Sequence, residues 1–321
     1  MMRNKKISSF LNKYAVPIIL LVFVLLIQAF NPGFHLLTWT NFQVILTQST
    51  ILGLISLGLS ICVISGVTDM SIGGTVGLIG AVFAVSMVKG NGMVVSILLA
   101  LVVSAVLYII FTLLLAKSKY PSIIICICLM FICMGIERLY TDGKSIWLNN
   151  ETVQTFATGN VIGIPNLVYF LIVLYVISYI FINHTKSGYK IRIVGENATA
   201  AVETGINLTK IRILAFGIAF ALYWIASVLE PVRLGGSQLY AGQTYMLPAM
   251  AATFLGSSMI TPGRVNLIGT LIGSIFMSII MNFLTFLGAE FYFIPLVQGL
   301  LLLAGVALGT MRDRSIKQVP L

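Results

Sequence analysis

The chain has 321 residues, of which 59% are hydrophobic and 9% are charged, and its net charge is +10. A water-soluble domain carries about 25% charged residues to cover its surface, so this composition excludes a soluble enzyme, a disordered chain and a disulfide-rich secreted module. The positive charge does not predict a nucleic-acid partner, because the Lys and Arg residues are scattered at the ends of apolar runs. The class that remains is an all-α polytopic membrane protein.

Apolar runs follow one another along most of the chain. A helix that crosses a hydrocarbon core of about 30 Å needs about 20 mostly apolar residues, and the runs lack the alternation of a β-barrel. About ten transmembrane helices are therefore predicted, over residues 15–34, 42–65, 70–88, 93–116, 121–140, 167–183, 213–232, 244–260, 265–288 and 293–311. The first run follows a basic segment and so resembles a signal peptide, but it is long and lacks a clear cleavage site, which favours a first span.

The positions of the cations predict the orientation of these spans. With ten spans and a cytoplasmic N-terminus, 15 of the 19 Lys and Arg residues lie on the cytoplasmic side, so both termini are expected inside the cell. Two long loops result, an outer one at about 141–166 and a basic cytoplasmic one at about 184–212. Neither is large enough to fold separately, so residues 1–321 are expected to form a single transmembrane domain.

The first polar interruption lies between the second and third predicted spans. Gly66 is expected to end the preceding helix, and Asp69 or Ser71 can cap the next one by accepting its free N–H groups. Gly73 opens a glycine-rich face that lets another helix approach closely. Two interpretations stay open: a turn with a conventional cap, or a broken helix beside a translocation pathway, which the acid favours. The candidate pathway residues here are Ser65, Asp69, Ser71 and Gly73.

A second candidate segment lies in the basic cytoplasmic loop, from Gly195 to Asn207. Asn197 is a good N-cap, and Gly205 suits the left-handed position that ends a helix. A helix this short does not persist alone, so it should dock on something. It is either a coupling helix that fits a groove on a cytoplasmic ATPase or a helix on the membrane surface or on its own protein. The candidate coupling residues are Gly195, Glu196, Asn197, Ala200, Ala201 and Gly205.

A third candidate segment, residues 234–249, is rich in Gly, hydroxyl groups and Tyr. It suits either the mouth of a pathway for a sugar-like solute, with Tyr245 as a candidate contact, or an ordinary re-entrant loop. Pro248 is expected to kink the span that follows.

The chain carries little that would support catalysis or metal binding. His35 and His184 are predicted on opposite faces of the membrane, and no paired acids, Ser–His pair or metal-ligand motif is present, so no catalytic residue and no metal site are expected. The four cysteines lie in apolar runs and are interpreted as small residues in packed helices. An ion-coupled secondary transporter is the alternative function, although Asp69 would be its one marginal acid.

Three blocks of the chain resemble the permeases of bacterial ATP-binding-cassette (ABC) importers of the ribose/galactoside type, carbohydrate uptake group 2, a family that includes autoinducer-2 permeases. Residues 66–73 resemble the signature G-[IGV]-x-D-[LMI]-S-[VIF]-G, and residues 195–207 are similar to the coupling segment G-x-N-x-x-A-A-x-x-x-G-I-N. Residues 247–256 resemble a later segment of the same family, A-[IM]-[AT]-A-x-x-L-G. Tyr245-Met246-Leu247-Pro248 departs from the acidic stretch of many sugar permeases and resembles autoinducer-2-type members.

The resemblance implies a permease subunit of the bacterial plasma (inner) membrane, surrounded by lipid. Two copies, or this chain and a sister permease, would work as a pair on ABC ATPase subunits, which would bind the ATP and Mg. An extracytoplasmic substrate-binding protein would deliver a small polar solute, a sugar or sugar-like molecule. Such a permease contains no cofactor and is not an enzyme, because ATP hydrolysis belongs to the partner.

Overall fold

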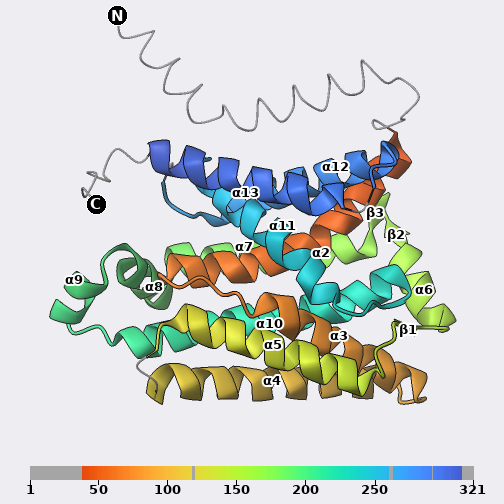
Figure 1. Ribbon diagram of the computed structural model, residues 1–321. Coiled ribbons are helices and arrows are strands. Elements are labelled where there is room, and N and C mark those ends of the chain that lie inside the picture. The colour runs from red at the N-terminus through yellow and green to blue at the C-terminus, as the bar shows by residue number, and fades with distance from the viewer. Residues whose placement is uncertain (1–37, 118–119, 260–262, 291, 313–321) are drawn as a thin grey trace, which may run out of the picture. The chain divides into compact units, whose positions relative to one another are not determined.

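The computed structural model describes residues 38–312 except for the short gaps 118–119, 260–262 and 291. The first predicted span, 15–34, lies outside the described residues. The elements follow the chain (Figure 1) as α2 (Trp39–Ile64), α3 (Ile72–Val88), α4 (Met93–Lys117), α5 (Ser122–Tyr140), β1 (Ile146–Trp147), α6 (Glu151–Thr158), β2 (Asn160–Val161), β3 (Ile164–Pro165), α7 (Asn166–His184), α8 (Lys186–Glu196), α9 (Ala198–Glu203), α10 (Leu208–Leu234), β4 (Gly236–Ser237), α11 (Ala241–Ser257), α12 (Leu267–Phe286) and α13 (Phe293–Arg312).

A helix occupies each of the other nine predicted spans, which confirms an all-α membrane protein. In the described part of the chain, six of these helices are long and apolar enough to cross a membrane: α2, α4, α5, α7, α10 and α12. α3 and α11 have 17 residues each. At 1.5 Å per residue they are about 26 Å long, which is shorter than a hydrocarbon core of about 30 Å.

The chain divides into two compact units, and α2 and α11 each run from one into the other. One unit is Thr50–Met246, and the other combines the residues before Thr50 with those from Leu247 onward. In the second unit, a core of Leu255, Met259, Phe276 and Ile280 joins α11 to α12. The candidate residues all fall in the Thr50–Met246 unit.

α3 is the central helix of the Thr50–Met246 unit, and 14 of its residues are buried. It packs against α4, α5 and α10. A β-carbon at Gly74 would overlap the carbonyl oxygen of Met130 in α5, and one at Gly80 would lie 3.0 Å from the carbonyl oxygen of Ser227 in α10. The predicted glycine face is thus confirmed as a surface on which helices pack backbone to backbone.

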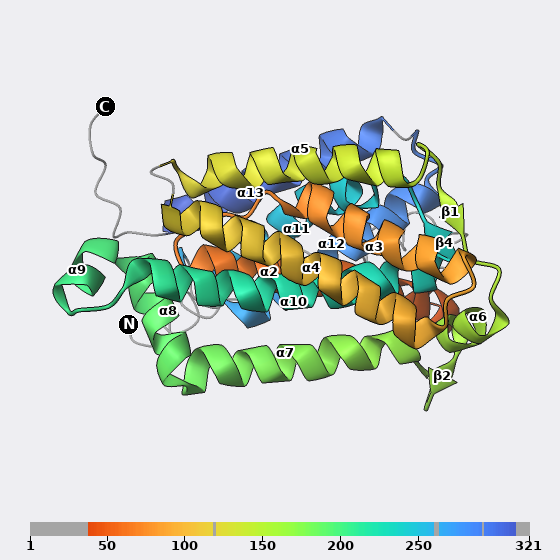
Figure 2. The ribbon, with the colours of Figure 1, turned by 90° about the horizontal axis from the view of Figure 1, so that it is seen from below.

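The outer helices of this unit carry apolar side chains on their exposed faces. α4, α5 and α7 each present exposed Leu, Ile, Val or Phe residues, and Figure 2 shows α7 along one side. Such faces suit contact with lipid and not with water. Cys126 is buried and Cys128 is exposed, so the two lie on different faces of α5, as their spacing predicts.

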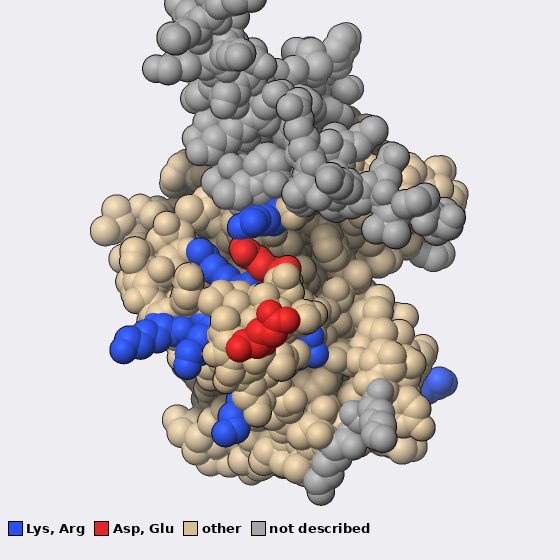
Figure 3. Space-filling view, turned by 90° about the vertical axis from the view of Figure 1, so that its left-hand side faces the viewer, with Lys and Arg blue, Asp and Glu red and all other residues tan. Residues whose placement is uncertain are grey.

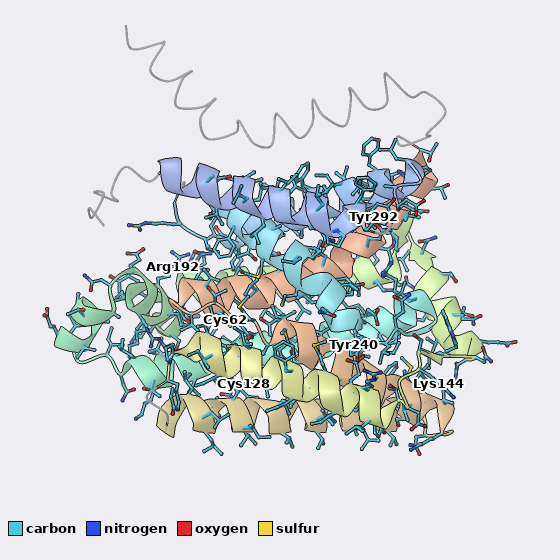
Figure 4. All side chains as sticks on the ribbon, viewed as in Figure 1. Cys62, Cys128, Lys144, Arg192, Tyr240 and Tyr292 are labelled. Atoms are coloured by element: carbon cyan, nitrogen blue, oxygen red, sulfur yellow. The ribbon has the colours of Figure 1, made fainter. Side chains whose placement is uncertain are left out.

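The two ends of the Thr50–Met246 unit differ in structure. Arg192 and Lys144 lie at opposite ends (Figure 4). The end with α8 and α9 is called the α9 end, and Figure 3 shows Lys and Arg side chains gathered there. The other, the α6 end, carries α6 and two short antiparallel pairs, β1 with β4 and β2 with β3. The two long loops, 141–166 and 184–212, therefore lie at opposite ends of this unit.

Candidate functional site

The connector between α2 and α3 begins at Gly66, which ends α2. Gly66 has a φ of +83°. The N–H groups of Gly66 and Val67 donate to carbonyl oxygens in the last turn of α2, at 2.9 and 3.2 Å. This Schellman arrangement, in which a left-handed glycine satisfies the last free carbonyls, confirms the predicted helix break. The Ser65 hydroxyl is used in the same turn, because it donates to the carbonyl oxygen of Cys62 at 2.6 Å.

The connector runs back alongside α5 before α3 begins. A β-carbon at Gly73, in the first turn of α3, would lie 2.9 Å from Sδ of Met130. Met130 follows Ser122, the first residue of α5, by eight residues, or about 12 Å along the helix. α3 therefore starts within the length of α5 and not level with its end.

Asp69 lies in this connector and caps α3. The residue is fully buried, and its Oδ1 accepts the backbone N–H of Ser71 at 2.8 Å. Ser71 itself makes no side-chain cap bond, because its φ of −69° and ψ of −16° are already helical and not the extended angles of a capping residue. Neither Oδ2 of Asp69 nor the Ser71 hydroxyl has a hydrogen-bond partner in the described part of the chain.

Side chains from three helices surround the Asp69 carboxylate. Cys62 of α2, Cys126 of α5 and Tyr223 of α10 all interact with it electrostatically. Tyr223 packs tightly on α2, where a β-carbon at Gly58 would lie 2.6 Å from its Cε1. The burial of the two cysteines confirms their expected packing role. Their position beside an acid had no signal in the sequence, because it depends on how three distant segments meet.

Tyr245 lies in a second polar cluster, toward the α6 end. Nη2 of Arg233 donates to the Tyr245 hydroxyl at 3.1 Å, and Glu230 interacts electrostatically with both Arg233 and Glu137. Glu137 and Glu230 are only 0% and 2% exposed. Neither Glu137 nor Glu230 is among the candidate residues predicted from the sequence. The available signal was that each falls inside a predicted span.

A left-handed turn joins this second cluster to α3. Tyr240 has a φ of +62°, and its N–H donates to Oε1 of Glu137 at 2.9 Å. Two residues later, a β-carbon at Gly242 would lie 2.9 Å from the carbonyl oxygen of Ile72 and 3.0 Å from that of Gly73. The structure therefore brings the candidate residue Gly73 against the helix that carries Tyr245.

The candidate coupling segment forms the six-residue helix α9, which is capped at both ends as predicted. The Asn197 side chain accepts the N–H of Ala200 at 3.0 Å. Gly205 has a φ of +79° and donates its N–H to the last turn of α9 at 2.9 Å. Ala201 is buried, Ala200 is half-buried and Glu196 is exposed, so α9 rests on its own chain by one side only.

α8 precedes this segment and was not predicted. Thr185 caps it by accepting the N–H of Gly188 at 3.1 Å. Its buried residues, Gly188, Ile191 and Val194, recur at intervals of three and therefore lie on one face. The threonine followed by this apolar spacing was the signal that the sequence offered.

The last turn of α8 touches the start of the connector. A β-carbon at Gly195 would overlap the carbonyl oxygen of Ile64, the last residue of α2, and would lie 3.0 Å from the backbone nitrogen of Gly66. The candidate coupling segment and the candidate pathway segment, which the sequence presents as separate features, are thus in backbone contact. Across the described residues, no group of three or more His, Cys, Asp or Glu side chains could hold a metal ion.

The amino-acid sequence matches one protein-family model and several curated permease proteins. The family model described as "Branched-chain amino acid transport system / permease component" matches residues 41–306. The ribose import permease protein of Bacillus subtilis (strain 168) is 31% identical, over 90% of this chain and 90% of its own length. The galactose/methyl galactoside import permease protein of Haemophilus influenzae is 29% identical, over 97% and 98%. The autoinducer 2 import system permease protein of Enterobacter sp. (strain 638) is 27% identical, over 98% and 89%. No solved structure matches the chain.

Proposed function

Because this chain belongs to the family of permease components of branched-chain amino acid transport systems, we propose that it passes a sugar or sugar-like solute through the membrane for an ABC importer. It is a multi-pass inner-membrane permease of the ABC importer class, and the resemblance expected from its motifs is confirmed. The class of solute is inferred from relatives named for ribose, galactosides and autoinducer 2.

One observation carries the ATP-driven mechanism: a capped six-residue helix stands at the α9 end with one side free, and the last turn of α8 just before it touches the connector that holds Asp69. A helix this short persists only when its caps and its neighbours hold it, so its free side suits docking on a partner. The partner is an ATPase subunit that binds and hydrolyses ATP with Mg, and Glu196, Asn197, Ala200, Ala201 and Gly205 belong to the docking segment. The α9 end then faces the cytoplasm.

The pathway runs past the connector and the polar cluster around Tyr245. Asp69 and Ser71 retain unpaired buried oxygens, which can exchange hydrogen bonds with a hydroxylated solute when the connector opens. Gly73 keeps that wall of the pathway free of side-chain bulk, and Ser65 fixes the end of α2. Tyr245, held by Arg233, supplies an aromatic face and a hydroxyl that suit a sugar ring.

The assembly follows from this orientation. The chain has ten spans with both termini in the cytoplasm, because this arrangement places 15 of the 19 Lys and Arg residues on the cytoplasmic side. Two permease chains, identical or sister, form the pore, and an extracytoplasmic binding protein delivers the solute at the α6 end.

Purification and uptake together test the proposal. The permease is expressed with its neighbouring ATPase and binding-protein genes, purified in mild detergent and reconstituted in vesicles, with radiolabelled ribose and galactose as probes. A co-purifying ATPase and uptake that requires ATP are the expected results. Uptake that persists without ATP and collapses with the ion gradient would establish an ion-coupled secondary transporter instead.

A further inference from the structure

Gly195 and Gly66 form a contact that leaves no room for any side chain at Gly195. The φ of Gly195 is not left-handed, so an alanine would suit its backbone, but the added β-carbon would overlap the carbonyl oxygen of Ile64. From the other side, a β-carbon at Gly66 would lie 3.3 Å from Cα of Gly195. Any shift of the coupling segment toward α2 must therefore move this backbone as well, since packed backbone atoms do not compress.

The connector between α2 and α3 is short and is held by hydrogen bonds at both ends, so it cannot easily absorb such a shift. It is anchored at one end by the hydrogen bonds of Gly66 and Val67 to the last turn of α2, and at the other by the bond from Ser71 to Asp69. Only two residues, Val67 and Thr68, separate Gly66 from Asp69. A displacement at Gly66 thus reaches Asp69 within three residues.

A second physical connection ends at the same carboxylate. α10 begins shortly after α9, where Asn207 caps it by accepting the N–H of Lys210 at 3.0 Å. Tyr223 lies about 22 Å along this helix from Leu208, and it interacts with Asp69 electrostatically. The coupling segment therefore connects to Asp69 both through the connector and through a continuous helix.

We infer that Gly195 and Gly66 are positioning residues for transport, and that their contact passes the movement of the coupling segment to the connector that carries Asp69. The inference rests on the proposed ATP-driven function and adds the route by which the ATPase acts on the pathway. Neither glycine touches the solute, and each acts through Asp69.

A cysteine in the connector reports whether the connector moves. Thr68 is half-buried in this segment, and Cys128 is the exposed native cysteine of the described chain. Thr68→Cys is introduced together with Cys128→Ser, and the permease is purified with its ATPase. The rate of labelling by N-ethylmaleimide is then measured without nucleotide and with ATP plus vanadate. A severalfold change in the labelling rate on adding nucleotide is expected. If the two glycines served only to stabilise the fold, replacing them in a complex that still assembles would leave this change in rate unaltered.

Two variants break the contact, each with a matched control. Gly195→Ala should abolish the nucleotide-dependent change in rate, whereas Gly135→Ala, at a position with nothing within 4 Å of the added β-carbon, should keep it. Gly66→Asn should reduce the change, because asparagine tolerates a left-handed φ but places its β-carbon against Gly195. Gly90→Asn is its control, since Gly90 shares a φ of +83° and has open space around it.

The possible results separate this inference from the proposed function. A Gly195→Ala complex that assembles and shows the full change in rate overturns the inference. So does a reporter that stays unchanged in an active complex with both glycines intact. Should Gly195→Ala fail to assemble, a full change in the Gly66→Asn complex overturns it. The absence of any co-purifying ATPase would instead contradict the proposed function itself.

Discussion

The backbone N–H of Tyr240 donates a 2.9 Å hydrogen bond to Oε1 of Glu137, which joins a left-handed turn to a fully buried acid. A non-glycine residue in this conformation costs about 1–3 kcal/mol, so surrounding contacts must hold it. In the same turn, the N–H of Leu239 donates to the hydroxyl of Ser145 at 3.2 Å, and Ser145 lies in the loop that follows α5. The start of α11 is thus held from α5 and from the loop that follows it.

Removing the Glu137 acceptor should loosen this turn. Glu137→Ala leaves the Tyr240 N–H without its buried partner and should lower the free energy of unfolding by about 1–3 kcal/mol. Glu137→Gln keeps a carbonyl oxygen and should cost less. Thermal unfolding of the purified permease in detergent checks both, with the exposed Glu290→Ala as control. Equal unfolding temperatures for Glu137→Ala and the control would show that the bond does not hold the turn.

Local features of the fold could be predicted from sequence because neighbouring residues decide them. Gly66 and Gly205 end helices, and Asn197 and Asn207 begin them, through bonds that span only a few residues. The apolar runs likewise predicted helix positions, since burial in lipid requires them. α10 begins several residues before its apolar run, because the Asn207 cap and not hydrophobicity sets its start.

The rest depended on contacts between distant parts of the chain. Glu137 and Glu230 fall inside predicted spans, but nothing near them in sequence reveals that both are almost fully buried or that Glu230 interacts with Arg233 and Glu137. The packing of Gly195 on Gly66 joins segments far apart in sequence, so neither motif predicts it. Composition and spacing could not predict which acids inside helices belong to the candidate site, because the packing of distant helices decides which acids are buried.

A long cation on α9 should prevent docking of the ATPase. Ala200 is only partly covered by its own chain, so Ala200→Arg projects a long charged side chain from α9 toward the docking partner, where a close helix-to-groove contact has no space for it. ATPase co-purification and uptake should be lost, while membrane insertion stays near normal. Thr155→Arg, which adds an arginine at an exposed position of α6, should retain the ATPase. Normal uptake by Ala200→Arg would remove the docking hypothesis.

The close packing of α3 on α5 should not tolerate a methyl group. Gly74→Ala forces its β-carbon into the carbonyl of Met130, and overpacking of this kind costs about 1–3 kcal/mol. The measurement is the unfolding temperature of the purified permease, compared with that of Gly135→Ala, whose added methyl group meets open space. A stable Gly74→Ala variant would mean that the two helices can separate without cost.

Asp69 has two separable properties, the cap that it provides and the buried carboxylate that we propose lies beside the pathway. Asp69→Asn keeps a side-chain oxygen for the Ser71 N–H, and so should unfold near the temperature of the unchanged protein. Asp69→Ala removes the cap and should lower stability by about 0.5–2 kcal/mol. If the carboxylate serves transport, both variants lose uptake, although only the alanine variant loses stability. Normal uptake by Asp69→Asn would leave capping as the role of this residue, and the pathway would then have to be sought around Tyr245.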